Sequence, residues 1–124
     1  MSAQIDLTVQ QGSLEQRVFT VYSDAAGTVL RDISAYNKAT LEVRKTYDAS
    51  KPLLTLTESS GITLLSGSSQ VVFTFLPSQT TPLKVTGEEL DAVYQLEVYT
   101  DGDPDSTIRL AEGDFTLSRE VVRS

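Results

Sequence analysis

The chain has 124 residues, of which 17 are acidic and 10 basic, and it contains no histidine, cysteine or tryptophan. Without histidine or cysteine it lacks the usual proton shuttle, the thiol nucleophile and the preferred ligands of transition metals. The formal net charge of −7 disfavours nucleic acids and anionic membranes as partners, because their phosphates repel an acidic surface. The composition therefore predicts a protein that is not an enzyme, uses no cofactor and acts through its surfaces.

Short runs that alternate apolar and polar residues recur along the chain, and such alternation is typical of strands with one buried face. In chain order it predicts strands at 5–9, 17–22, 28–30, 39–44, 53–57, 62–65, 71–75, 92–100 and 107–117. The second and third of these are expected to form a hairpin across Gly27, and the last two a hairpin across the acidic segment 101–105.

The segment 86–91 has two readings. Thr86 followed by Glu89 three residues later has the spacing of a capping box, which predicts a single helical turn. The same segment also reads as an acidic loop.

The parity of the last predicted strand changes along its length. Ile108 and Leu110 stand at even positions, whereas Phe115 and Leu117 stand at odd ones. A regular strand would point these pairs to opposite faces, so we expect a β-bulge near Glu112–Gly113 that returns them to one core face.

About eight or nine short strands, at most one helical turn and the absence of long helical patterns favour an antiparallel β-sandwich or barrel. No apolar stretch approaches the roughly 18 residues that span a bilayer. We expect one domain over residues 1–124, with arms at 1–4 and 119–124 that extend from its first and last strands.

The acidic segment is the candidate metal site. Asp101, Asp103, Asp105 and Glu112 reproduce the spacing of a calcium-binding loop, in which carboxylate oxygens replace the hydration of a hard cation. Ser106 stands where such loops need glycine, and Pro104 stiffens the segment. These departures favour an ordinary exposed hairpin turn, and the prediction is that no metal binds.

Two tyrosines are candidates for binding through an exposed ring. Tyr47 and Tyr99 lie near predicted loops, and aromatic faces of this kind can stack on sugars. A carbohydrate-binding module would require Tyr47, Tyr99 and the acidic loop to line one groove.

A series of short pieces resembles a family of small structural proteins of tailed-phage virions. The pieces are Gln11-Gly12, Phe19-Thr20-Val21, Ala39-Thr40-Leu41-Glu42-Val43-Arg44, Gly61-Ile62-Thr63-Leu64, Tyr94-Gln95-Leu96-Glu97-Val98 and Gly113-Asp114-Phe115. The family includes proteins similar to tail-collar and fibre-attachment proteins and to domains of baseplate upper proteins. The resemblance implies an immunoglobulin-like β-sandwich, several copies per particle and no catalytic residues.

The expected function is that of a non-enzymatic virion structural protein, an oligomeric adaptor of the tail, collar or baseplate. It would occupy the host cytoplasm before assembly and the phage particle afterwards, with other virion proteins as partners. Arg119, Val121, Val122 and Arg123 are the candidate contacts of the carboxyl-terminal arm. The alternatives are a capsid decoration protein and, from another class, a carbohydrate-binding or adhesin module.

Overall fold

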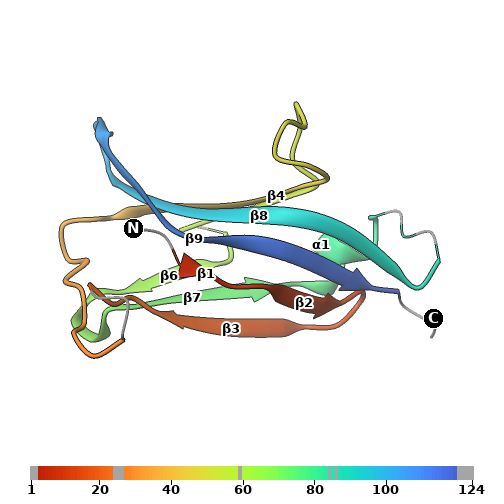
Figure 1. Cartoon of the computed structure of the whole chain (residues 1–124), viewed down its shortest axis with the longest axis horizontal. Helices are drawn as coiled ribbons and strands as arrows, with labels where there is room; N and C mark the ends of the chain where they lie inside the picture. Colours follow the sequence, from red (N-terminus) through yellow and green to blue (C-terminus); the bar gives the residue numbers. More distant parts are fainter. Residues whose placement is uncertain (1–2, 24–26, 59, 84, 86, 120–124) are drawn as a thin grey trace.

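The computed structural model describes residues 3–23, 27–58, 60–83, 85 and 87–119, and this part of the chain is mostly β-structure in two facing sheets (Figure 1). Sheet A is the larger sheet, and sheet B has three strands. Sheet A contains β1 (Ala3–Gln4), β2 (Leu7–Gln10), β4 (Lys38–Arg44), β5 (Leu54–Thr57), β8 (Glu89–Thr100) and β9 (Asp103–Ser118). Sheet B contains β3 (Glu15–Thr20), β6 (Ile62–Leu65) and β7 (Gln70–Phe75). The predicted sandwich-like arrangement is confirmed.

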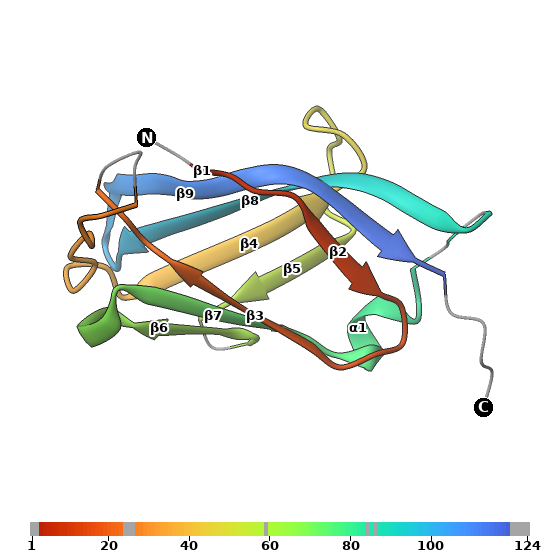
Figure 2. The ribbon, with the colours of Figure 1, turned by 60° about the horizontal axis from the view of Figure 1, so that its bottom comes forward.

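The strand order is β1-β9-β8-β4-β5 in sheet A, where β2 also pairs with β9, and β3-β7-β6 in sheet B. Two expectations fail at the amino terminus. The sheets are not wholly antiparallel, because β1 and β2 run parallel to β9, with Ala3 opposite Ala111 and Leu7 opposite Phe115. Residues 3–4 are a paired strand rather than part of an arm. The chain crosses from sheet A to sheet B between β2 and β3, so β3 is not available as a neighbour of β2. The free neighbour of β2 in sheet A is the last strand, β9, which runs in the same direction (Figure 2).

The last two strands form the predicted hairpin, but β8 and β9 are much longer than expected. Glu89 already belongs to β8, so the helical turn expected over 86–91 is wrong, and Thr86 lies outside the described residues. A single α-helical turn forms instead at α1 (Pro77–Thr80), where proline occupies the start of the helix. The hairpin expected with 28–30 is reduced to an isolated bridge between Tyr22 and Leu30.

The helical turn α1 is tied to the turn between β2 and β3. The Gln11 side-chain amide donates hydrogen bonds to the carbonyl oxygens of Thr80 at 3.1 Å and of Leu83 at 2.8 Å. The Thr80 hydroxyl accepts a hydrogen bond from the backbone N–H of Gly12 at 2.9 Å. Because Gln11 and Thr80 are buried, these bonds satisfy polar groups that would otherwise destabilise this end of the sandwich.

The predicted bulge is present in the β8–β9 hairpin, but its position was wrong. Leu96 pairs with Ala111 while Glu97 pairs with Arg109, so Leu110 is the extra residue of the bulge. Leu110 and Ala111 are both buried, which moves the parity change about two residues before Glu112–Gly113. The sequence-based placement failed because alanine fits a buried position as readily as an exposed one.

Gly113 serves a different purpose, since it allows the amino-terminal strand to approach β9 closely. It lies opposite Tyr94, and a Cβ atom at this position would collide with the Ile5 carbonyl oxygen. That carbonyl oxygen accepts a hydrogen bond from the Tyr94 hydroxyl at 2.6 Å, and the Ile5 N–H donates to the Glu112 carbonyl at 2.9 Å. The contacts of Ile5 therefore fasten the segment between β1 and β2 to two strands of sheet A.

The core lies between the sheets. Alternate residues of the central strands are fully buried, and the Phe75 and Phe115 rings meet across the sandwich with their centroids 5.6 Å apart. This packing leaves the remaining residues of each strand on one of two outer faces.

Candidate interaction surface

Among the described residues of its three strands, the outer face of sheet B carries no charged side chain. Glu15, Arg17 and Phe19 face the same side of the sheet as the buried Phe75, Phe73 and Val71 of β7, so the residues between them point away from the core. We call this outward set the sheet B face: Gln16, Val18, Thr20, Thr63, Leu65, Gln70, Val72 and Thr74.

Hydrogen bonds across the strands order this face. The Gln16 amide donates to the Thr74 hydroxyl oxygen at 3.3 Å, and the Gln70 amide donates to the Thr20 hydroxyl oxygen at 3.4 Å. Val72 lies at the centre, where the strand register places it between Val18 on β3 and Thr63 on β6. The sheet B face is therefore flat, neutral and partly apolar, with Val72 in the middle.

The outer face of sheet A is the opposite in character. It presents charged side chains at most outward positions of its three long strands: Lys38, Glu42, Arg44, Glu89, Asp91, Glu97, Arg109, Glu112 and Asp114. Three ion pairs involve these residues: Arg44 with Glu42 at 2.6 Å, Arg109 with Glu112 at 2.9 Å and Lys38 with Glu58 at 3.9 Å. Apart from Glu15 and Arg17, which lie on the inner side of sheet B at its edge, the charged side chains of the paired strands thus lie on the outer face of sheet A.

Exposed apolar side chains gather on the side of sheet B. Of the eight large hydrophobic residues that are exposed in the described part of the chain, only Tyr47 lies on sheet A. The others belong to β3 or β6, or to segments that precede or follow β3 and β7: Leu14, Val18, Tyr22, Val29, Leu30, Leu65 and Leu76. Exposed apolar surface with few charges is typical of sites that contact other proteins, and on the sheet B face Val18 and Leu65 supply it.

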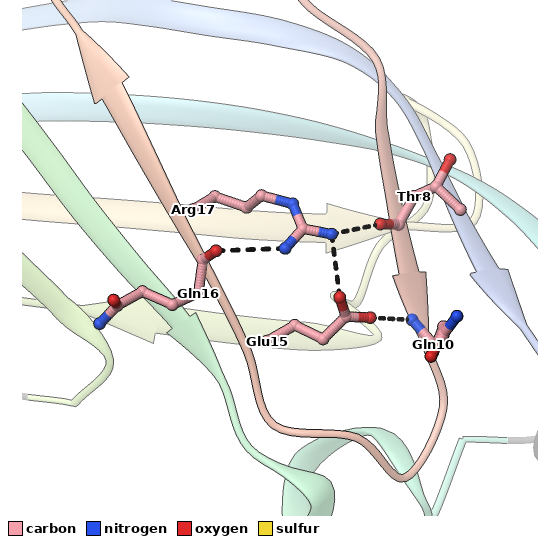
Figure 3. A network of polar contacts seen from close by, with 5 residues as sticks. All are labelled: Thr8, Gln10, Glu15, Gln16 and Arg17. Atoms are coloured by element: carbon pink, nitrogen blue, oxygen red, sulfur yellow. Dashed lines mark hydrogen bonds and ion pairs between the residues drawn. The ribbon is translucent and has the colours of Figure 1, made fainter.

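The edge of sheet A beside β3 is capped by side chains (Figure 3). The Arg17 guanidinium donates to the Thr8 carbonyl oxygen at 2.8 Å and lies 3.0 Å from the Glu15 carboxylate. That carboxylate in turn accepts a hydrogen bond from the backbone N–H of Gln10. Because Glu15 and Arg17 occupy backbone groups that β2 would otherwise offer to a further strand, this edge is protected from strand addition.

A cavity of about 370 Å³ lies between the β1–β2 segment and β3. Its lining includes the core residues Phe73 and Ala111 and the charged residues Asp6 and Arg17, of which Arg17 is engaged by Thr8 and Glu15. The cavity is a gap between two sheet edges, and its lining also includes the hydroxyl-bearing residues Thr8 and Tyr94.

The structure separates the candidate calcium ligands. Thr100 pairs with Asp103, so the hairpin tip is only Asp101–Gly102, and Asp103 already belongs to β9. Glu112 lies beyond the bulge, opposite Gln95 and ion-paired with Arg109. Within the described residues, no group of three or more acidic side chains is close enough to hold a metal ion.

The two candidate tyrosines are also apart. Tyr47 contacts a hollow of about 60 Å³ that is lined by Glu42, Arg44 and Gln95 on sheet A. Tyr99 lies opposite Lys38, four residues beyond Gln95 on β8, which corresponds to roughly 13 Å along a strand. Desolvation, together with the Glu112 and Asp114 carboxylates, raises the pKa of the Tyr47 hydroxyl. The shared groove that a carbohydrate module would need is not formed by these residues.

The carboxyl-terminal arm does not begin at Arg119 as expected. The Arg119 N–H donates to the Glu88 carbonyl oxygen at 2.8 Å, and its guanidinium donates to the Gly87 carbonyl oxygen at 3.3 Å. Arg119 thus extends the pairing between β8 and β9. The other candidates of the arm, Val121, Val122 and Arg123, lie outside the described residues.

Comparisons with known proteins leave the family open. No family model matches the sequence, and no curated protein matches it. Among the described residues, no helix has the length and apolar character required to cross a membrane.

Proposed function

We propose that the chain is a non-enzymatic structural protein of a phage particle, an oligomeric adaptor of the tail, collar or baseplate. The observation that carries the proposal is the segregation of charge between the outer faces of the two sheets. A solvated domain gains solubility from charges on all sides, whereas a neutral, partly apolar face suits a surface that another subunit covers.

The strand order supports the immunoglobulin-like part of the proposal. The order β9-β8-β4-β5 against β3-β7-β6 corresponds to that of immunoglobulin-like sandwiches, in which the last two strands adjoin the third and the second strand pairs in the opposite sheet. The first strands lie beside the last one, with β1 and β2 parallel to β9.

The module would assemble by docking surfaces of complementary shape, and no chemical reaction is needed. Contacts that are weak singly become strong when symmetry repeats them around a ring, because each further contact forms within one particle. The partners are other copies of the chain and neighbouring virion proteins, with no role for nucleic acid or membrane. The protein would be located in the phage particle, and in the host cytoplasm before the particle is assembled.

The test is immunogold electron microscopy of purified particles from a phage that encodes the chain. We expect gold at the tail, collar or baseplate, in a fixed number of positions per particle. Gold over the head would favour the decoration protein instead. Particles that contain none of the chain by mass spectrometry would contradict both readings.

A further inference from the structure

We propose that the sheet B face docks onto the same face of a second copy of this chain, around a twofold axis that passes near Val72. This inference deepens the proposed function and rests on it for the setting in which many copies meet. The contact is isologous, so each residue meets its counterpart or a symmetry-related neighbour on the other copy.

Electrostatics favours this face for self-association. Each copy carries a formal charge of −7, so two copies repel each other wherever their charged surfaces meet. Facing sheets lie about 10 Å apart, so docking B against B stacks four layers and separates the two charged A faces by roughly 30 Å. That separation is several times the Debye length of about 8 Å at physiological ionic strength, and the repulsion between the A faces is largely screened.

The chemistry of the face makes it complementary to itself. Its polar groups are threonine hydroxyls and glutamine amides, and each of these both donates and accepts hydrogen bonds. A charged partner would find no counter-ion on the face. Val18, Val72 and Leu65 supply the apolar surface, and the bonds from Gln16 to Thr74 and from Gln70 to Thr20 hold the polar groups in place before docking.

The size of the face sets the expected strength. Three strands of about six residues cover roughly 300 Å², well below the approximately 800 Å² that each partner contributes to a standard stable interface. Such a small contact belongs with the weak and transient interfaces, so the free chain should dimerise only weakly. Repetition of the contact within a particle would make it effective at lower concentrations.

Opposite charges at position 72 test the twofold arrangement. Val72→Lys and Val72→Glu each place two like charges near the axis, so each variant alone should dimerise at least about tenfold more weakly than the wild type. An equimolar mixture of the two pairs lysine with glutamate and should regain the wild-type dimer. Thr116→Lys is the matched control, because Thr116 is also half-buried and outward-facing, on a strand of sheet A that is paired on both sides.

The measurement is sedimentation velocity from about 10 µM to 1 mM, with melting curves to show that each variant is folded. The inference holds if the wild type and Thr116→Lys dimerise alike, each single Val72 variant dimerises at least about tenfold more weakly, and the mixture regains the wild-type strength. A wild type that stays monomeric at 1 mM, single variants that dimerise normally, or a mixture that fails to associate would each overturn it.

The same data separate this inference from the proposed function. A chain that is monomeric in solution but present in the tail leaves the proposed function standing and removes the B-to-B contact. A chain that dimerises through Val72 but is absent from particles leaves the B-to-B contact standing and removes the proposed function.

Discussion

Replacing Gly113 with alanine is expected to lower the free energy of unfolding by about 3 kcal/mol. The new Cβ atom would overlap the Ile5 carbonyl oxygen and lie 2.8 Å from the Ile5 carbonyl carbon and 3.0 Å from the Asp6 carboxylate. Backbone atoms cannot rotate away as a flexible side chain does, so the segment between β1 and β2 must move off β9. That movement breaks the 2.6 Å hydrogen bond from the Tyr94 hydroxyl and part of the parallel pairing.

Gly67→Ala is the matched control, because a Cβ atom at Gly67 has no neighbour within 4 Å. Urea unfolding of both variants measures the difference, and the control should stay within about 0.5 kcal/mol of the wild type. Hydrogen exchange at Leu7 and Val9 should accelerate in Gly113→Ala alone. A Gly113→Ala variant as stable as the control would show that the amino-terminal strand does not pack against β9 as described.

Alkaline pH is expected to destabilise the fold through Tyr94. Burial, reinforced by the nearby Asp6 carboxylate, raises the pKa of the Tyr94 hydroxyl to about 12, above its ordinary value of 10. The folded state therefore holds this proton more tightly than the unfolded state does. The resulting stability is fully present below pH 10 and is lost as the pH rises to 12, by about 3 kcal/mol in total.

Tyr94→Phe isolates this effect, because the two proteins differ in no other ionisable group. At pH 8 the variant should be less stable than the wild type by about 1 kcal/mol, since it lacks the hydrogen bond to Ile5. Between pH 10 and 12 the wild type should lose stability faster, so that the gap closes and then reverses. Urea unfolding at several pH values measures the difference in the free energy of unfolding between the two proteins. A difference that stays constant to pH 12 would contradict the burial of the Tyr94 hydroxyl.

The strands were largely predictable because alternation reports directly which residues face the core. The runs at 39–44 and 71–75 became β4 and β7 almost residue for residue. Alternation does not report the partner or direction of a strand, and for this reason the parallel pairing of β2 with β9 was missed. A local pattern can also favour a structure that pairing with a distant strand prevents. The spacing of Thr86 and Glu89 favoured a helical turn, but Glu89 pairs with Ser118 of β9 instead.

The candidate surface could have been predicted only in part. The outward positions of β3 and β7 already differ in the sequence from those of β4, since Gln16, Val18 and Val72 stand where β4 has Glu42 and Arg44. The sequence alone does not show that β3, β7 and β6 are neighbours, or that their outward residues form one face. The metal and sugar candidates lie apart for the converse reason, because spacing along the chain placed Glu112 and Tyr99 near groups from which the β-ladder separates them.

The central claim, that the neutral face of sheet B is the assembly surface, is tested most directly by incorporation into particles. Phage that lacks the chain would be complemented with wild-type, Val72→Lys or Thr116→Lys protein, and the copies per purified particle would be counted by quantitative mass spectrometry. We expect Thr116→Lys to reach the wild-type number and Val72→Lys to fall at least about tenfold below it. Equal numbers of all three chains in the particle would contradict the claim.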